Sequence, residues 1–100
     1  MLSIAAAIHQ IKVLRRAGPW EDAFCSGVSA DSRSVEKGHL FVAIRGLRAD
    51  GHQFIDKAIQ KGAKVLVVED WPTVSVPDAV VVLQVADSRK ALGVLAAHFY

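Results

Sequence analysis

The sequence predicts an α/β domain of three layers, in which about three helices cover a mainly parallel, mixed sheet of about four to five strands. Three apolar runs, at 40–44, 63–68 and 79–85, are typical of strands that are buried on both faces. A helical pattern lies between the first two runs, and such a crossover favours parallel pairing with a right-handed connection. The 100 residues, 52% of them hydrophobic, suit a single globular domain.

The first quarter of the chain is predicted to form a helix that Ser3 caps and Gly18-Pro19 ends. Its apolar residues recur at helical spacing: Ile4, Ile8, Ile11 and Leu14. Residues 21–27 are expected to be a connector. A short strand at 28–30 then leads into the polar run Asp31-Ser32-Arg33.

The remaining elements follow in the order turn, strand, helix, strand, loop, strand, helix. A turn at 36–38 precedes the strand 40–44, and Asp50-Gly51 introduces the crossover helix, which Gly62 ends. The expected apolar face of this helix is Phe54, Ile55, Ala58 and Ile59. After the strand 63–68, a loop at 69–78 leads to the strand 79–85. The last helix is expected to be capped by Asp87 or Ser88 and to bury Ala91, Leu92, Leu95, Ala96 and Phe99.

Composition and charge exclude several classes of function. The net charge of +2 is small and the basic residues are scattered, so no nucleic-acid-binding surface is predicted. No apolar run approaches the roughly 18 residues of a membrane-spanning helix. The single cysteine allows no intramolecular disulfide, and the predicted location is the cytoplasm. The four histidines lie far apart in the sequence, so no metal site is expected.

The chain contains no recognised catalytic motif. A phosphate-binding loop needs the frame G-x-x-x-x-G-K-[ST], and no G-x-G-x-x-G follows a strand either. Ser32 and Cys25 lie in no signature of a nucleophile. No catalytic residue is therefore expected within these residues.

Two polar loops form the candidate binding site, because ligands usually bind where loops leave the carboxyl ends of parallel strands. In the first loop, the Ser32 hydroxyl and nearby backbone groups could bind a nucleotide base or sugar. Asp31 could equally accept backbone hydrogen bonds in an Asx-type turn, with Arg33 paired to a nearby carboxylate. Both interpretations remain open on residue chemistry.

The second loop, 46–51, is similarly open to two interpretations. Its glycines serve tight turns with or without a ligand, and Asp50 is expected to cap the helix that follows. Basic residues such as Arg33 or Arg48 could lie near phosphate, since a guanidinium can bind two oxygens at once. His52 could contact a ligand, or it could cap the helix or bond to a turn.

The runs DSR, G-x-L-F-V-A-I-x-G and DGH-x-F-I-x-x-A-I-x-x-G-A lie between about Val28 and Tyr100. This pattern resembles the Mur ligases of bacterial cell-wall synthesis, and in particular their amino-terminal domain. The resemblance implies that residues 1–100 hold the uridine diphosphate end of a UDP-N-acetylmuramoyl-peptide. It also implies a cytoplasmic, ATP-dependent ligase whose central domain, which binds ATP and Mg²⁺, and whose carboxyl-terminal domain lie beyond this chain. The last helix still runs at Tyr100, which agrees with a longer protein.

The resemblance implies substrate contacts at Ala30, Ser32, Leu47, Arg48 and Ala49. Backbone groups of the second loop would read the edge of the uracil, and Leu47 and Ala49 would pack on its ring. A supporting set consists of Asp31, Arg33, Gly46, Asp50 and His52. No metal or cofactor site is implied in this chain itself.

Within the family, the pattern is more similar to the ligase that adds the third residue of the stem peptide than to the one that adds the terminal dipeptide. The identity of the added amino acid is not encoded here. A competing hypothesis is an α/β interaction module without enzymatic function, whose polar turns are purely structural. General affinity for ATP is a third hypothesis, and the missing phosphate loop argues against it.

Overall fold

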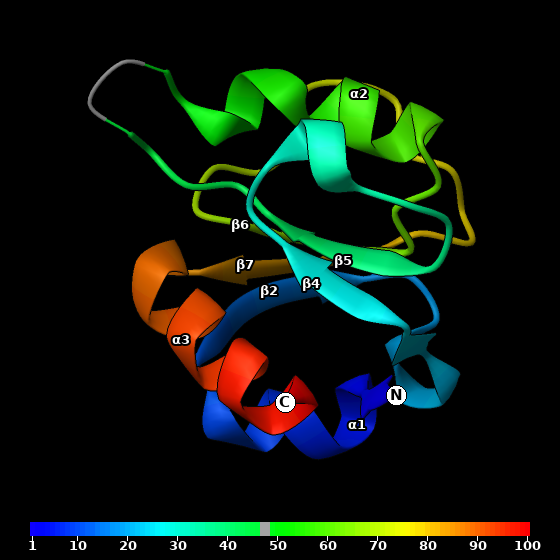
Figure 1. Ribbon diagram of the computed structural model, residues 1–100, viewed down its shortest axis with the longest axis vertical. Helices are drawn as coiled ribbons and strands as arrows, with labels where there is room; N and C mark the ends of the chain where they lie inside the picture. The colour runs from blue at the N-terminus through cyan, green and yellow to red at the C-terminus, as the bar shows by residue number, and fades with distance from the viewer. Residues whose placement is uncertain (47–48) are drawn as a thin grey trace.

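The computed structural model describes residues 1–46 and 49–100, which form three layers around a central five-stranded sheet (Figure 1). The strand order is β2-β7-β6-β5-β4, and only β2 runs antiparallel to its neighbour. The strands are β2 (Val13–Ala17), β4 (Gly27–Ser29), β5 (His39–Val42), β6 (Val65–Val68) and β7 (Val81–Val85). The predicted mixed, mainly parallel sheet is confirmed.

Helices cover both faces of the sheet, so successive strand residues enter different cores. The helix α2 (Ile55–Gln60) lies over the face that presents Phe41, Leu66 and Val82. The helices α1 (Ile4–Ala7) and α3 (Ser88–Phe99), with the 3₁₀ turn η1 (Ile8–Gln10), cover the face of Leu40, Val67 and Leu83. Burial on both faces explains why the central strands are continuous apolar runs.

The predicted first helix is wrong beyond Gln10. Ser3 does cap α1, accepting a hydrogen bond from the Ala6 amide at 3.4 Å, but the chain then extends into the edge strand β2. Successive side chains of a strand point to opposite faces. Arg15 accordingly lies 3.8 Å over the ring of Trp71, whereas Arg16 lies 4.3 Å over the ring of Trp20. These two contacts favour the extended strand.

The predicted connector at 21–27 also contains regular structure. The strand β1 (Leu2–Ser3) pairs antiparallel with β3 (Phe24–Cys25), and a 3₁₀ turn, η2 (Trp20–Asp22), precedes β3. Each strand of this ribbon has two residues, which is too short to show any alternation of apolar and polar residues, so the ribbon could not be predicted.

The crossover from β5 to β6 agrees with the sequence in its position and its end. A 3₁₀ turn, η4 (Gly51–Phe54), leads into α2, and Gly62 follows the helix with a φ of +100°. The last helix, α3, is capped by Asp87, whose carboxylate accepts from the Lys90 amide at 3.1 Å. In the part of the chain that the structure describes, no helix has the length and hydropathy of a membrane span.

Candidate functional site

Polar residues gather at the edge of the sheet where its parallel strands end. The strands β4, β5, β6 and β7 run in the same direction, so the segments that follow them meet at this edge. These segments begin at Ala30, Ala43, Glu69 and Ala86. Both loops that the sequence singled out lie here, and the second leads directly into η4 and α2.

The turn after β4 is held by hydrogen bonds within the turn. The Asp31 carboxylate accepts from the Arg33 amide at 2.9 Å and from the Arg33 guanidinium through Nε at 3.0 Å and Nη2 at 2.9 Å. The Ser29 hydroxyl donates to the Asp31 carbonyl at 2.9 Å and accepts from the Asp31 amide at 3.1 Å. The Asx-type turn and its paired arginine are therefore present, and Asp31 caps the 3₁₀ turn η3 (Ser32–Ser34).

This pairing predicts a low pKa for Asp31. Hydrogen bonds from the Arg33 side chain, and then from the Arg33 amide, lower the pKa of the Asp31 carboxyl from 3.8 to about 2. A depressed pKa means that the ionised pair supports the turn above about pH 4, near the ordinary value, and is lost as the pH falls through about 2.

We expect an NMR titration of the Asp31 carboxyl carbon to give a midpoint near 2 in the wild-type protein. Replacing Arg33 by glutamine should move the midpoint up towards the ordinary value of about 4. A wild-type midpoint that already lies near 4 would show that the Asp31 to Arg33 pair does not persist in solution.

Ser32 differs from its neighbours in the turn, because it is buried and its hydroxyl is uncommitted. Only 7% of the residue is exposed. Among the described residues its hydroxyl has no hydrogen-bond partner, whereas Ser29 and Asp31 are both engaged. A hydroxyl without a partner in the described part of the chain is suited to a polar contact with a ligand.

The loop after β5 is closed by three backbone contacts. The Gly46 amide donates to the Ala49 carbonyl at 2.8 Å, and Arg45 pairs with Asp50 in an isolated antiparallel bridge. The Gly51 amide donates to the Ile44 carbonyl at 2.7 Å. These contacts fix both ends of the loop. The predicted contacts Leu47 and Arg48 lie outside the described residues.

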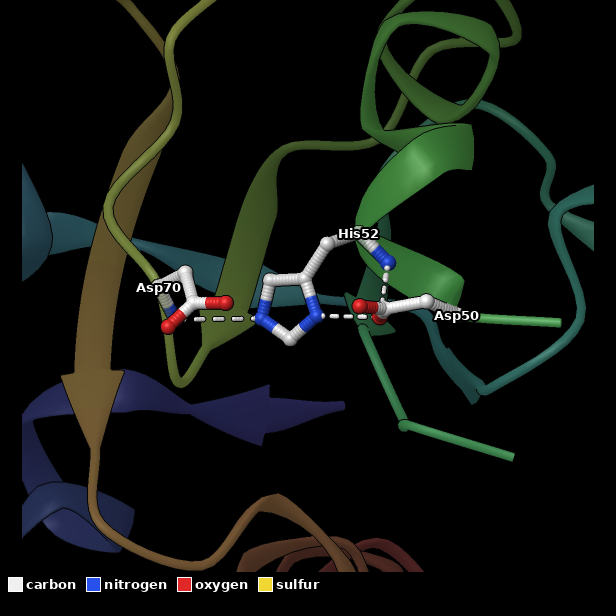
Figure 2. Close-up of side chains that lie close together, drawn as sticks. All are labelled: Asp50, His52 and Asp70. Atoms are coloured by element: carbon white, nitrogen blue, oxygen red, sulfur yellow. Dashed lines mark hydrogen bonds and ion pairs between the residues drawn. The ribbon is translucent and has the colours of Figure 1, made fainter. Parts of the chain in front are cut away.

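Asp50 and His52 form a clasp between this loop and the end of β6, as Figure 2 shows. The Asp50 carboxylate accepts from the His52 amide at 3.0 Å and lies 2.7 Å from the ring Nδ1. The ring Nε2 accepts from the amides of Glu69 at 2.9 Å and Asp70 at 3.1 Å. This pattern assigns the neutral tautomer with its proton on Nδ1. Of the three roles that the sequence allowed, the contacts of His52 correspond to hydrogen bonding to a turn, and Asp50 caps η4 as predicted.

Arg45 and Glu69 extend the clasp towards α3. The Arg45 guanidinium donates to Glu69 Oε1 at 2.8 Å and also contacts the Asp70 carboxylate. The second Glu69 oxygen accepts from the amide and the hydroxyl of the fully buried Ser88, at 2.8 and 2.9 Å. The network therefore joins the loop after β5, the end of β6 and the start of α3. Sequence reasoning missed it, since Arg45 and Glu69 are far apart in the chain.

Ligand atoms of Asp50, His52 and Asp70 lie within 4.8 Å of one another. Such spacing alone could suit a metal ion, but both ring nitrogens of His52 already have partners. A metal at Nε2 would have to displace two backbone hydrogen bonds. The observed arrangement is thus a hydrogen-bonded clasp.

A cleft of about 410 Å³ lies between the turn after β4 and the start of α2. Its lining combines both polar loops with one face of the helical segment: Ala30, Asp31, Ser32, Arg33, Ile44, Ala49, Gly51, Phe54 and Lys57. The described members of the principal predicted set, Ala30, Ser32 and Ala49, thus lie together. Gly46, Asp50 and His52 lie outside the lining and support the loop instead.

Four residues of the lining were not among the predicted site residues, namely Ile44, Gly51, Phe54 and Lys57, and the last two come from the helical segment. Phe54 was assigned to the buried face of the helix, and this is wrong because 37% of it is exposed. It precedes the first full turn of α2, with ψ at 9°, so its side chain leaves the apolar face that Ile55 begins. Lys57 follows one turn later. Its spacing of three from Phe54 was the available signal.

Fold and cleft together define a class of protein, namely a small α/β domain with a cleft at the carboxyl edge of its parallel strands, where domains of this kind usually bind their ligands. The chain belongs to the Mur ligase family: residues 25–100 match the family model described as "Mur ligase family, catalytic domain".

Individual relatives agree with this assignment. The chain is 45% identical over 101 aligned residues to the UDP-N-acetylmuramoyl-L-alanyl-D-glutamate--2,6-diaminopimelate ligase of Chlorobium phaeobacteroides, and 38% identical over 99 residues to the ligase of the same name from Cytophaga hutchinsonii. Each match covers 99% of this chain and 20% of the relative, so the chain spans about a fifth of the length of these ligases.

Solved structures show the same fold. A crystal structure of MurF from Acinetobacter baumannii matches with a TM-score of 0.61 and 36% identity, over 72% of this chain and 15% of that protein.

Proposed function

We propose that this chain is the domain that holds the UDP end of UDP-N-acetylmuramoyl-L-alanyl-D-glutamate within a larger ligase of peptidoglycan synthesis. The observation that carries the proposal is the cleft, because it joins Ser32 and Ala49 from two separate loops. The names of the curated relatives support the choice of ligand. They also favour 2,6-diaminopimelate as the amino acid that the whole protein adds.

The geometry of the cleft suits a ligand that is bound mainly by hydrogen bonds to its polar edge. The turn at Asp31 and both ends of the loop after β5 are fixed by internal hydrogen bonds, so these parts of the cleft are formed before a ligand binds. Ser32, a largely buried residue, adds a hydroxyl that has no hydrogen-bond partner among the described residues. A uracil offers two acceptors and one donor along one edge, which such a hydroxyl and nearby backbone groups can match.

The proposed role is positioning. Binding energy obtained at the UDP end fixes the far end of the substrate, where the carboxylate is joined to the incoming amine, and so lowers the barrier of a step that occurs elsewhere. We propose that ATP and Mg²⁺ bind in the rest of the protein, whose central domain is the partner of this chain.

A second candidate is the ligase that adds the terminal dipeptide, because the matching solved structures include MurF enzymes. The diaminopimelate ligases match over 99% of the chain, compared with 72% for that MurF structure, which favours the first candidate. Assay of the full-length protein with 2,6-diaminopimelate and with D-alanyl-D-alanine separates the two, since only one should be consumed.

Isothermal titration of the chain with UDP-N-acetylmuramoyl-L-alanyl-D-glutamate tests the proposal. We expect binding by the wild type, no comparable binding of ATP, and about three- to tenfold weaker binding by the Ser32→Ala variant, the effect of one lost hydrogen bond. Ser75, which is exposed and lies outside the cleft, provides the control Ser75→Ala. Its affinity and both unfolding midpoints should match the wild type.

The competing hypotheses give different results in the same experiment. An interaction module without a nucleotide site would bind no UDP-sugar at all. A general nucleotide-binding domain would bind ATP about as well as the UDP-sugar.

A further inference from the structure

One face of the helical segment forms the wall of the cleft opposite the Asp31 turn. Gly51, Phe54 and Lys57 recur at a spacing of three along η4 and the first turn of α2, and all three line the cleft. The next turn lies close to the opposite wall, because the Lys61 ammonium donates to the Arg33 carbonyl at 2.9 Å. Helix and turn therefore hold each other at a fixed separation.

Phe54 places an exposed aromatic ring in this polar cleft. Its neighbours Ile55 and Ala58 are buried in the core beneath α2, whereas 37% of Phe54 remains exposed. Phe54 is not an isolated apolar residue on the surface, because it lines the cleft together with Ser32 and Lys57. An aromatic ring in such a place offers a flat apolar surface to a flat ligand ring.

Lys57 supplies the available positive charge of the lining. Arg33 lies there too, but two of its guanidinium nitrogens are bonded to the Asp31 carboxylate, so these two charges largely cancel. Within residues 1–46 and 49–100, the Lys57 ammonium has no ion-pair or hydrogen-bond partner. The lining thus has an uncompensated cation suited to an anionic group.

We propose that Phe54 and Lys57 are substrate contacts, with the Phe54 ring packed on the uracil and the Lys57 ammonium paired with the diphosphate. The inference rests on the proposed function and assigns the diphosphate to Lys57 in place of Arg33. One helical turn separates the two side chains, about 4.5 Å at 1.5 Å per residue, and the flexible lysine stem adds reach. Base and diphosphate are thus bound by neighbouring positions on one helix face.

The contact between Phe54 and the base is tested by NMR of the bound nucleotide. In the wild-type chain the ring current of Phe54 should shift the H5 and H6 protons of UDP upfield. The Phe54→Leu variant, which keeps an apolar side chain, should lose this shift and bind UDP about tenfold more weakly. The Phe54→Tyr variant should retain both properties. A purely structural Phe54 would leave the ligand shifts of the leucine variant unchanged.

Comparison of UDP with uridine tests the contact between Lys57 and the diphosphate. The Lys57→Gln variant should bind UDP up to about fivefold more weakly at low salt, as expected for one exposed ion pair, and should bind uridine like the wild type. The Lys57→Arg variant should retain UDP affinity, and added salt should reduce the difference. Lys64→Gln is the matched control, since Lys64 directly precedes β6, at the opposite end of the parallel strands, and lies outside the cleft.

These experiments distinguish failure of the roles given to Phe54 and Lys57 from failure of the proposed UDP-binding function. If the wild type binds UDP and the Phe54 and Lys57 variants behave like it with both ligands, this inference is overturned and the proposed function stands. If the wild type binds neither UDP nor the UDP-sugar, the proposed function fails and this inference fails with it.

Discussion

Replacing Gly51 by alanine should lower the free energy of unfolding by about 2 to 4 kcal/mol and abolish binding of the UDP-sugar. A Cβ at this position would lie 2.6 Å from the Ile44 amide nitrogen and 2.9 Å from its carbonyl oxygen. These are backbone atoms that cannot move aside alone. Overpacking of this kind costs about 1 to 3 kcal/mol, and the bond from the Gly51 amide to the Ile44 carbonyl would be lost as well.

Urea unfolding of Gly51→Ala and of a matched control measures this effect. Gly93 is the control, because a Cβ there meets nothing within 4 Å and the residue lies inside α3. Gly93→Ala should raise stability by about 0.5 to 1 kcal/mol through helix propensity. If Gly51→Ala is as stable as the wild type, Gly51 does not approach the backbone of Ile44 as closely as described.

Removal of the Glu69 carboxylate should cost about 2 to 4 kcal/mol of stability. Only 20% of this side chain is exposed, and its two oxygens serve the Arg45 guanidinium and both polar groups of Ser88. In Glu69→Ala the buried amide and hydroxyl of Ser88 lose their acceptor, which costs about 1 to 3 kcal/mol for an unsatisfied buried group. Arg45 loses a partner too.

The same guanidinium provides the control for this prediction. Asp70 also pairs with Arg45, but its side chain is 61% exposed, so Asp70→Ala should cost no more than about 1 kcal/mol. Thermal or urea unfolding of both variants gives the comparison. Equal losses would contradict the view that burial of Glu69 and its bonds to Ser88 hold the network together.

The Gly51→Ala and Glu69→Ala variants should also weaken ligand binding, because both disturb the loop after β5. Gly51 lines the cleft itself, whereas Glu69 acts through Arg45 and the clasp at His52. We therefore expect Glu69→Ala to weaken binding of the UDP-sugar less than Gly51→Ala does. Such a difference would separate residues that shape the cleft from residues that support it.

The central strands could be predicted from the sequence because burial on both faces produces continuous apolar runs. β5, β6 and β7 were each located to within two residues. The edge strand β2 could not be recognised, since one of its faces carries Arg15 and the other Arg16. Both are held by contacts with tryptophans elsewhere in the chain. The isoleucines before β2 recur at helical spacing, which extended the predicted helix beyond Gln10, where the helical structure ends.

The place of the cleft could also be predicted, because loops at the carboxyl ends of parallel strands meet at one edge. What could not be predicted was how these loops are held. The bonds from Glu69 to Arg45 and Ser88 join residues far apart in sequence, and local spacing carries no sign of them. Phe54 was misplaced because the segment up to it is a 3₁₀ turn, in which the side-chain period is 3.0 and not 3.6.

Chemical-shift mapping with UDP-N-acetylmuramoyl-L-alanyl-D-glutamate tests the central claim most directly. The claim predicts that backbone amide shifts cluster at 30–33, at 49–51 and at 54–57, with little change at the opposite edge near Lys64. A second hollow, of about 530 Å³, lies between η1 and α3 and is lined by Lys12 and Lys90 among others. Shifts confined to that hollow, or spread without a cluster, would contradict the assignment of the UDP site to the cleft beside Ser32.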